Sequence, residues 1–358
     1  MRKTVRFAAA ACVAGLLGVG LMPAPAPAAL PAGISGATTI APMLQQVTPA
    51  VVNIAVLSRA PQAENPLLRD PFFRRFFNIP DQEAKPQVSA GSGVIVDARR
   101  GYVVTNAHVV ENAQEIAVTL KDRRRLRAKL VGRDAATDIA LLKIEATNLT
   151  ALPWGDSDHL QVGDFVVAIG NPFGLGQTVT SGIISALGRS GLKVEGYEDF
   201  IQTDASINPG NSGGALVNFN GELIGINTAI IGPAGGSVGI GFAVPVSIVK
   251  SVMEQLVEYG EVRRGRLGVA IQDLTPDLAD SMNLTGDAGA VIAKVEPNSA
   301  ADKAGFRSGD VVVAVEGRAV RSATDFRNRM GLVRVGTPMQ VTVLRGGNER
   351  NLTVRTSR

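Results

Sequence analysis

The sequence predicts a mostly β protein in which an antiparallel barrel or sandwich is followed by a smaller unit. The chain has 358 residues, which is enough for two or three domains. Its 40 glycines interrupt many short runs that are rich in β-branched residues. Because few long helical patterns separate these runs, antiparallel strands explain the spacing better than a helix bundle does.

We expect a strand wherever such a run is bounded by turn residues. The runs are Val51–Leu57, Gly93–Asp97, Tyr102–Thr105, Glu115–Leu120, Asp138–Ile144, Phe165–Ile169, Gly182–Leu187, Gly214–Asn218 and Leu223–Asn227. Apolar residues at helical spacing then predict a helix over Val246–Glu258. A charged connector, Glu261–Arg266, leads into the second unit.

Residues 1–29 have the pattern of a signal peptide for export. Arg2, Lys3 and Arg6 precede the apolar run Phe7–Met22, and small residues that suit cleavage follow it. The run is short for a membrane span and prolines end it, so we favour a cleaved signal over the alternative, an uncleaved anchor. Removing these three positive charges lowers the formal charge from +4 to +1, which argues against a nucleic-acid partner.

Three further sequence features concern thiol chemistry, the N-terminal segment and a long insertion. The only cysteine is Cys12, inside the expected signal, so disulfides and thiol catalysis are excluded from the mature chain. Residues 30–40 are rich in small residues and proline and are expected to form a flexible N-terminal segment. The long insertion Asn65–Lys85 places phenylalanines on one face of a short predicted helix. This insertion either packs onto its own domain or contacts a neighbouring subunit.

The chain has two histidines, and histidine is the usual general base near neutral pH. His108 lies in Thr105–Val110, at the end of a predicted strand pair. His159 lies in a polar turn and is expected at the surface. The search for a general base therefore points to His108.

A glycine-rich turn between two apolar segments has the composition that a nucleophilic serine needs. Its sequence is Asn208-Pro209-Gly210-Asn211-Ser212-Gly213-Gly214. Gly210 can take backbone angles that aim its N–H and that of Ser212 into one pocket. Such donors stabilise the oxyanion of a tetrahedral intermediate. We expect Ser212 to be the nucleophile, with an oxyanion hole over Gly210, Asn211 and Ser212; the alternative is an ordinary β-turn.

Asp138 is the expected third member of a catalytic triad with His108 and Ser212. It opens an apolar strand, and a buried carboxylate needs a partner such as His108, whose tautomer it would hold. Asp134 is the nearby competitor, but no apolar strand follows it directly. The order His, Asp, Ser is the order found in chymotrypsin.

Several motifs together resemble the HtrA/Deg family of serine proteases. They are Thr105–Val110, Thr137–Leu141, Gly163–Gly176, Asp204–Leu216 and Gly239–Pro245. The resemblance implies two six-stranded antiparallel β-barrels of the chymotrypsin type over residues 41–260, an ATP-independent endopeptidase, and assembly as a homotrimer or multiples of trimers. It also implies that Ile207 and Ile230 line an aliphatic substrate pocket; the alternative is that both belong to the barrel core. Arg189 begins a segment that resembles the family's sensor loop, a regulatory loop.

Residues 261–358 resemble a PDZ domain. In such domains an apolar-Gly-apolar loop binds a peptide's C-terminal carboxylate, and the peptide adds as a strand beside a helix. The loop residues implied here are Leu267, Gly268 and Val269. The groove helix is expected over Ala323–Gly331, with Phe326 and Met330 either in the pocket wall or in the core.

The resemblance implies an endopeptidase exported to the periplasm that degrades unfolded or mislocalised proteins. Peptide C-termini bound at the PDZ groove would activate it or tether substrates, and peripheral membrane association remains an option. Two alternatives stay open: a membrane-anchored regulatory protease that cuts one signalling substrate, and a chaperone with minor proteolytic activity. The sequence contains no metal-ligand cluster, phosphate loop or nucleotide fingerprint, so we expect no metal and no cofactor.

Overall fold

The computed structural model describes residues 39–59, 86–172, 176–190, 197, 199–208, 210–230, 238–284, 286 and 288–357. The expected signal peptide, most of the flexible segment and the phenylalanine-rich insertion lie outside these residues.

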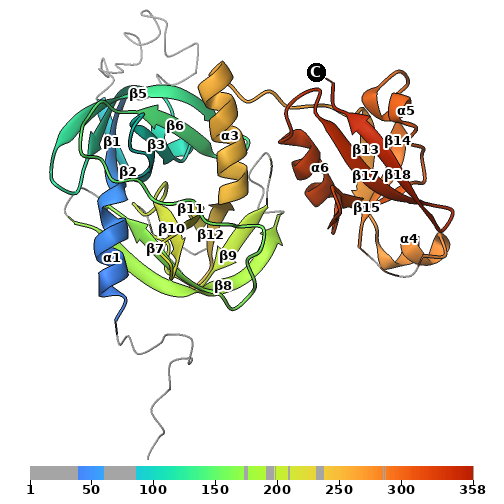
Figure 1. The fold of residues 1–358 in the computed structure, drawn as a ribbon, viewed down its shortest axis with the longest axis horizontal. Helices are drawn as coiled ribbons and strands as arrows, with labels where there is room; N and C mark the ends of the chain where they lie inside the picture. Colours follow the sequence, from blue (N-terminus) through green and yellow to red (C-terminus); the bar gives the residue numbers. More distant parts are fainter. Residues whose placement is uncertain are drawn as a thin grey trace, which may run out of the picture. The chain divides into compact units, whose positions relative to one another are not determined.

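The first barrel is a closed sheet of six antiparallel strands in the order β1-β2-β3-β6-β5-β4 (Figure 1). The strands are β1 Val51–Arg59, β2 Pro86–Asp97, β3 Tyr102–Thr105, β4 Ala113–Thr119, β5 Arg125–Asp134 and β6 Ile139–Lys143. Aliphatic side chains fill its interior, and Ile54, Val103 and Leu142 are fully buried there. Burial of such side chains is the main favourable contribution to folding.

The second barrel closes in the order β10-β11-β12-β9-β8-β7. Its strands are β7 Phe165–Gly170, β8 Thr178–Arg189, β9 Phe200–Thr203, β10 Ala215–Asn218, β11 Leu223–Ile230 and β12 Gly241–Pro245. One core cluster contains residues of both barrels, with Val104 and Leu141 from the first and Val167 and Ile226 from the second. The two barrels are therefore packed together.

Helical segments accompany the barrels in the described part of the chain. They are α1 Ala41–Val47, the short 3-10 helices Thr48–Ala50 and His108–Val110, and α3 Val246–Tyr259. The buried face of α3 joins the shared core through Val249, Val252 and Leu256. Gly260 ends this helix in the left-handed conformation, the usual role of glycine after a helix C-terminus.

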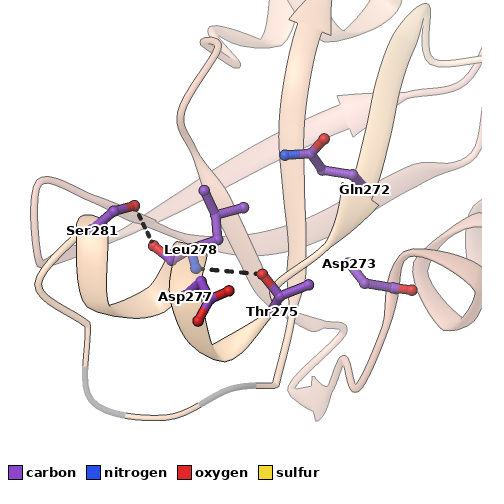
Figure 2. Close-up of a pocket in the computed structure, with 6 residues that line it drawn as sticks. All are labelled: Gln272, Asp273, Thr275, Asp277, Leu278 and Ser281. Atoms are coloured by element: carbon purple, nitrogen blue, oxygen red, sulfur yellow. Dashed lines mark hydrogen bonds between the residues drawn. The ribbon is translucent and has the colours of Figure 1, made fainter.

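The third sheet has six strands, in the order β13-β14-β15-β17-β18 with β16 paired to β15. The strands are β13 Val269–Asp273, β14 Ala290–Val295, β15 Val311–Val315, β16 Arg318–Ala319, β17 Pro338–Arg345 and β18 Asn348–Arg355, and the helices are α4 Pro276–Ser281, α5 Ala300–Ala304 and α6 Ala323–Gly331. At the start of α4 the Thr275 hydroxyl accepts from the Leu278 amide (Figure 2). The hollow drawn there is lined by Gln272, Asp273, Thr275, Asp277, Leu278 and Ser281.

The expected fold class, a mostly β chain with two closed six-stranded antiparallel barrels and a PDZ domain, is confirmed. The groove helix has the expected bounds, and the helix α3 ends one residue later than expected. Among the described strands of the two barrels, β5, β9 and β12 were not among the runs predicted from the sequence. β5 carries Arg125, Arg127 and Lys129 on exposed positions, so its sequence lacks the apolar character on which the prediction depended.

Candidate active site

His108 and Asp138 are brought together by the pairing of β3 with β6. Thr105 lies opposite Ala140 in this antiparallel pair. The segment that follows Thr105 and the segment that precedes Ala140 therefore lie at the same end of the barrel. The carbonyl of Asp138 accepts hydrogen bonds from the Ala107 amide (3.1 Å) and the Asn106 side-chain amide (3.0 Å). These bonds fix the segment before β6 against the turn that contains His108.

The Asp138 carboxylate holds the imidazole of His108 from one side. Its two oxygens lie 2.8 and 3.0 Å from Nδ1, and one of them also accepts from the His108 backbone N–H at 3.0 Å. The side chain of Asp138 is 13% exposed and that of His108 is 50% exposed. A carboxylate at Nδ1 fixes the ring so that Nε2 can accept a proton.

Asp138 itself has a backbone φ of +56°, an uncommon conformation for a residue other than glycine. The prediction that Asp138 is the first residue of a strand was therefore wrong by one residue, since β6 begins at Ile139. Aspartate and asparagine tolerate this left-handed region better than most residues. The conformation turns the carboxylate toward His108 while the apolar strand follows in the core.

Thr228 connects the acid to the nucleophile, and sequence reasoning missed it. The pairing of β11 with β12 shifts register between Asn227 and Ala229, so Thr228 lies in a bulge. Its hydroxyl donates to the Asp138 carboxylate, and its carbonyl accepts from the Ser212 hydroxyl at 3.2 Å. A single bulged residue thus contacts two members of the expected triad.

Ser212 lies in the tight turn that precedes β10. Among the described contacts its hydroxyl bonds to Thr228 and not to His108. Hydrogen bonds between catalytic groups are often long or misaligned without substrate, so the lack of this bond does not argue against Ser212 as the nucleophile. The arrangement suits acyl transfer through a serine nucleophile.

Two amides of the turn are available to an oxyanion. In the described part of the chain, the N–H groups of Gly210 and Ser212 donate to no protein acceptor. Gly210 has a φ of +100°, which glycine adopts without strain. Asn211 departs from the expectation: its N–H donates to the Asn208 carbonyl at 2.9 Å because the turn is closed by that bond. Among the described residues of this turn, the unpaired amides are therefore those of Gly210 and Ser212.

The competing acid and the second histidine have other partners. Asp134 is buried, accepts from the Thr137 hydroxyl at 2.6 Å, and pairs with Arg264 at 2.5 Å. His159 is 81% exposed and bonds Asp156 at 2.7 Å, an interaction that lowers the pKa of the Asp156 carboxyl. Neither residue belongs to the His108 cluster.

Ile207 and Ile230, expected in the substrate pocket, both approach Gly241. Ile230 lies opposite Gly241 in the strand pairing, and the Ile207 side chain fills the space that a Cβ at Gly241 would occupy. Ile207 is 1% exposed and packs in the core of the second barrel. The side chain of Ile230 lies outside the described part of the structure, so its wall role stays a prediction.

The loop expected to bind a carboxylate borders a cavity of about 360 Å³. Its lining includes Leu267, Gly268, Val269, Ile271, Phe326 and Met330. Among the described hydrogen bonds, the N–H groups of Leu267 and Gly268 have no acceptor. Phe326 and Met330 are buried in the core of this sheet and also face the cavity, so both of their expected placements apply.

Arg189 is the last residue of β8, and its Nε donates to the Gln202 side chain at 2.9 Å. Most of the expected sensor loop after it lies outside the described residues. Among the described residues there is no group of three or more potential metal ligands and no helix long and apolar enough to span a membrane.

Comparisons with known proteins agree with this geometry. Residues 91–226 match the model of a trypsin-like peptidase domain, and residues 265–356 match that of a PDZ domain. The chain is 49% identical to the periplasmic pH-dependent serine endoprotease DegQ of Escherichia coli K12, over 89% of this chain and 70% of that protein. It is 47% identical to the periplasmic serine endoprotease DegP of the same strain, over 98% of this chain and 79% of that protein. A solved structure of the HtrA-type protease AlgW with a decapeptide is 46% identical and has a TM-score of 0.66, covering 89% of this chain and 98% of that one.

Proposed function

The chain belongs to the HtrA/Deg family of trypsin-like serine endoproteases, and on that basis we propose that it hydrolyses unfolded or mislocalised proteins with His108, Asp138 and Ser212. The observation that carries the proposal is the continuous chain of contacts from His108 through Asp138 and Thr228 to Ser212. These groups come from both barrels. An unrelated surface cluster would not join a mostly buried acid, an imidazole and a serine in a glycine turn.

In the proposed mechanism Ser212 Oγ attacks the scissile carbonyl while His108 Nε2 takes its proton. The Asp138 carboxylate holds the tautomer that has Nε2 free and stabilises the imidazolium that forms. The N–H groups of Gly210 and Ser212 stabilise the oxyanion. His108 then returns the proton to the leaving amine, and water hydrolyses the acyl-enzyme by the same route.

The PDZ domain is proposed to bind peptide C-termini through Leu267, Gly268 and Val269. The two free amides of this loop suit a carboxylate, and the side chains of Ile271, Phe326 and Met330 in the cavity beside it suit a hydrophobic C-terminal side chain. The relatives DegQ and DegP are named as periplasmic, which supports an exported location for this chain as well. Assembly into trimers is proposed from the family alone.

Replacing Gly268 tests the carboxylate loop. Gly268 has a φ of +74°, and a Cβ there would lie 2.4 Å from the Cβ of Ser299. The Gly268→Ala variant is therefore expected to bind a peptide with a hydrophobic C-terminus at least about tenfold more weakly, because the loop must shift. Fluorescence anisotropy with a labelled peptide, and with its C-terminal amide as a non-binding analogue, measures the loss.

Gly317 provides a matched control for backbone strain. It has the same φ of +74° in the same domain, but a Cβ added at this position would have no atom within 4 Å. Gly317→Ala is expected to bind the peptide as the parent does. Equal binding by Gly268→Ala and the parent would rule out this loop as the carboxylate site.

Digestion of casein by the mature protein tests the proposed function and its regulation. We expect cleavage without ATP, accelerated about 5- to 150-fold by a peptide with a hydrophobic C-terminus, the range for a coupling of ~1–3 kcal/mol. Arg189→Ala is expected to lose the acceleration while Ser212 still reacts with a small fluorophosphonate. A peptide that binds but leaves the casein rate unchanged would reduce the PDZ domain to a tether.

A further inference from the structure

Ser92 is a fully buried polar residue in the apolar strand β2, and every polar group it has is bonded. Its amide donates to the carbonyl of Ser212 at 2.8 Å, and its carbonyl accepts from the Thr105 hydroxyl at 2.7 Å. Its hydroxyl is 2.7 Å from the amide of Asn171 and 2.5 Å from the carbonyl of Gly210. Such a full set of partners marks a residue whose position is specified from several sides.

The direction of the two hydroxyl bonds follows from their partners. The Asn171 N–H can only donate, so the Ser92 oxygen accepts there and its own proton is left for the Gly210 carbonyl. The relay runs from Asn171 through Ser92 to Gly210. Each bond therefore fixes the orientation of the next.

The residue opposite Ser92 in the sheet supports the same relay. Asn53 pairs with Ser92 across β1 and β2, and its side-chain amide donates to the carbonyl of Asn171 at 2.9 Å. Asn171 is thus held at its N–H by Ser92 and at its C=O by Asn53. Both side chains come from the first barrel, whereas Asn171 follows β7 of the second.

Ser92 contacts the two residues whose amides are proposed to stabilise the oxyanion, Gly210 and Ser212. It holds each of them by its carbonyl oxygen, one through the hydroxyl and one through the backbone N–H. The carbonyl of Gly210 belongs to the peptide unit between the two donors, so its orientation fixes how the turn presents them. The Ser92 hydroxyl therefore acts on the two donor amides through the backbone of the turn.

We propose that Ser92 is a positioning residue for the oxyanion hole, a role that rests on the proposed serine protease function. Its hydroxyl orients the Gly210–Asn211 peptide and thereby keeps the Gly210 and Ser212 amides aimed at one point. Oxyanion donors act through such preorganisation, and misplacement of a catalytic group by about 1 Å can cost ~10²-fold in rate. In this role, Ser92 of the first barrel supports an oxyanion hole whose donor amides belong to the second barrel.

The test compares a peptide ester with its thionoester, in which sulfur replaces the carbonyl oxygen. Sulfur is a weak hydrogen-bond acceptor, so an aligned oxyanion hole favours the oxygen ester and a misaligned one favours it less. Ser92→Ala is expected to lower kcat for the ester by about 10²-fold with little change in KM. In this variant the ratio of kcat for the ester to kcat for the thionoester is expected to fall by about tenfold. The same ratio is expected to fall in Ser92→Cys, which fills the same space with a weakly bonding thiol.

Thr203→Val is the matched control, because the Thr203 hydroxyl is also buried and also bonds one amide and one carbonyl. It accepts from Ala205 and donates to Ile183, away from the nucleophile turn. This variant is expected to lose stability without a change in the ester ratio. A parent-like ratio in Ser92→Ala, or an equal fall in Thr203→Val, overturns the positioning role. If ester hydrolysis by the unmodified protein does not depend on Ser212, that result contradicts the proposed function and the positioning role with it.

Discussion

The Ser212→Ala variant is expected to lose casein cleavage almost completely, by about 10⁶-fold in kcat, the scale for removing a triad serine. Without the Ser212 oxygen no acyl-enzyme forms, and the remaining groups stabilise only a slow attack by water. The fold is expected to persist, since the only described hydrogen bond of this hydroxyl goes to the Thr228 carbonyl. Initial rates with a fluorogenic casein and a thermal melt measure the two effects.

Ser308→Ala controls for the loss of one serine hydroxyl. Its Oγ donates to the Ala293 carbonyl at 2.7 Å in the PDZ sheet, so the change removes the same kind of bond at a distant position. This variant is expected to digest casein at the parental rate. Residual casein cleavage by Ser212→Ala within about tenfold of the parent would refute the nucleophile assignment.

Asp138→Asn is expected to lower kcat by about 10⁴-fold with little change in structure. Asparagine is nearly isosteric and tolerates the φ of +56° at this position. Its amide would present an N–H to His108 Nδ1, which favours the tautomer whose proton lies on Nε2 and blocks the general base. Steady-state kinetics with the same reporter give kcat, and the unfolding temperature reports the fold.

Asp134→Asn is the matched change at the competing acid. This carboxylate bonds Thr137 and Arg264, not His108, so the variant is expected to lose stability while retaining most of the turnover. If Asp134→Asn is the crippling change and Asp138→Asn is mild, the acid of the triad is Asp134.

Local sequence patterns predicted most of the strands that carry the site. Tyr102–Thr105 has the expected bounds, and β1, β7 and β11 begin where an apolar run begins. Strand β5 was not predicted, because its many charged, solvent-facing residues make the alternation of buried and exposed positions hard to recognise in the sequence. Strand β12 was predicted only through the family motif Gly239–Pro245, because a five-residue run ending in proline does not identify a strand by itself.

Contacts between distant segments could not be predicted in the same way. Thr228 and Ser92 contact the nucleophile turn only because the barrels close and pack together. No local sequence pattern around either residue indicates which residue it will contact. A polar residue between two glycines in an apolar strand was the available signal for Ser92. The sequence also offered Asn211 as an oxyanion donor, but no local pattern indicates that its amide bonds the Asn208 carbonyl and closes the turn.

The most direct test of the proposed mechanism is the site at which a fluorophosphonate labels the mature protein, mapped by mass spectrometry of the digested adduct. We expect a single adduct on Ser212, formed much more slowly in Asp138→Asn and absent in Ser212→Ala. An adduct on any other residue, or labelling that persists in Ser212→Ala, would contradict the account.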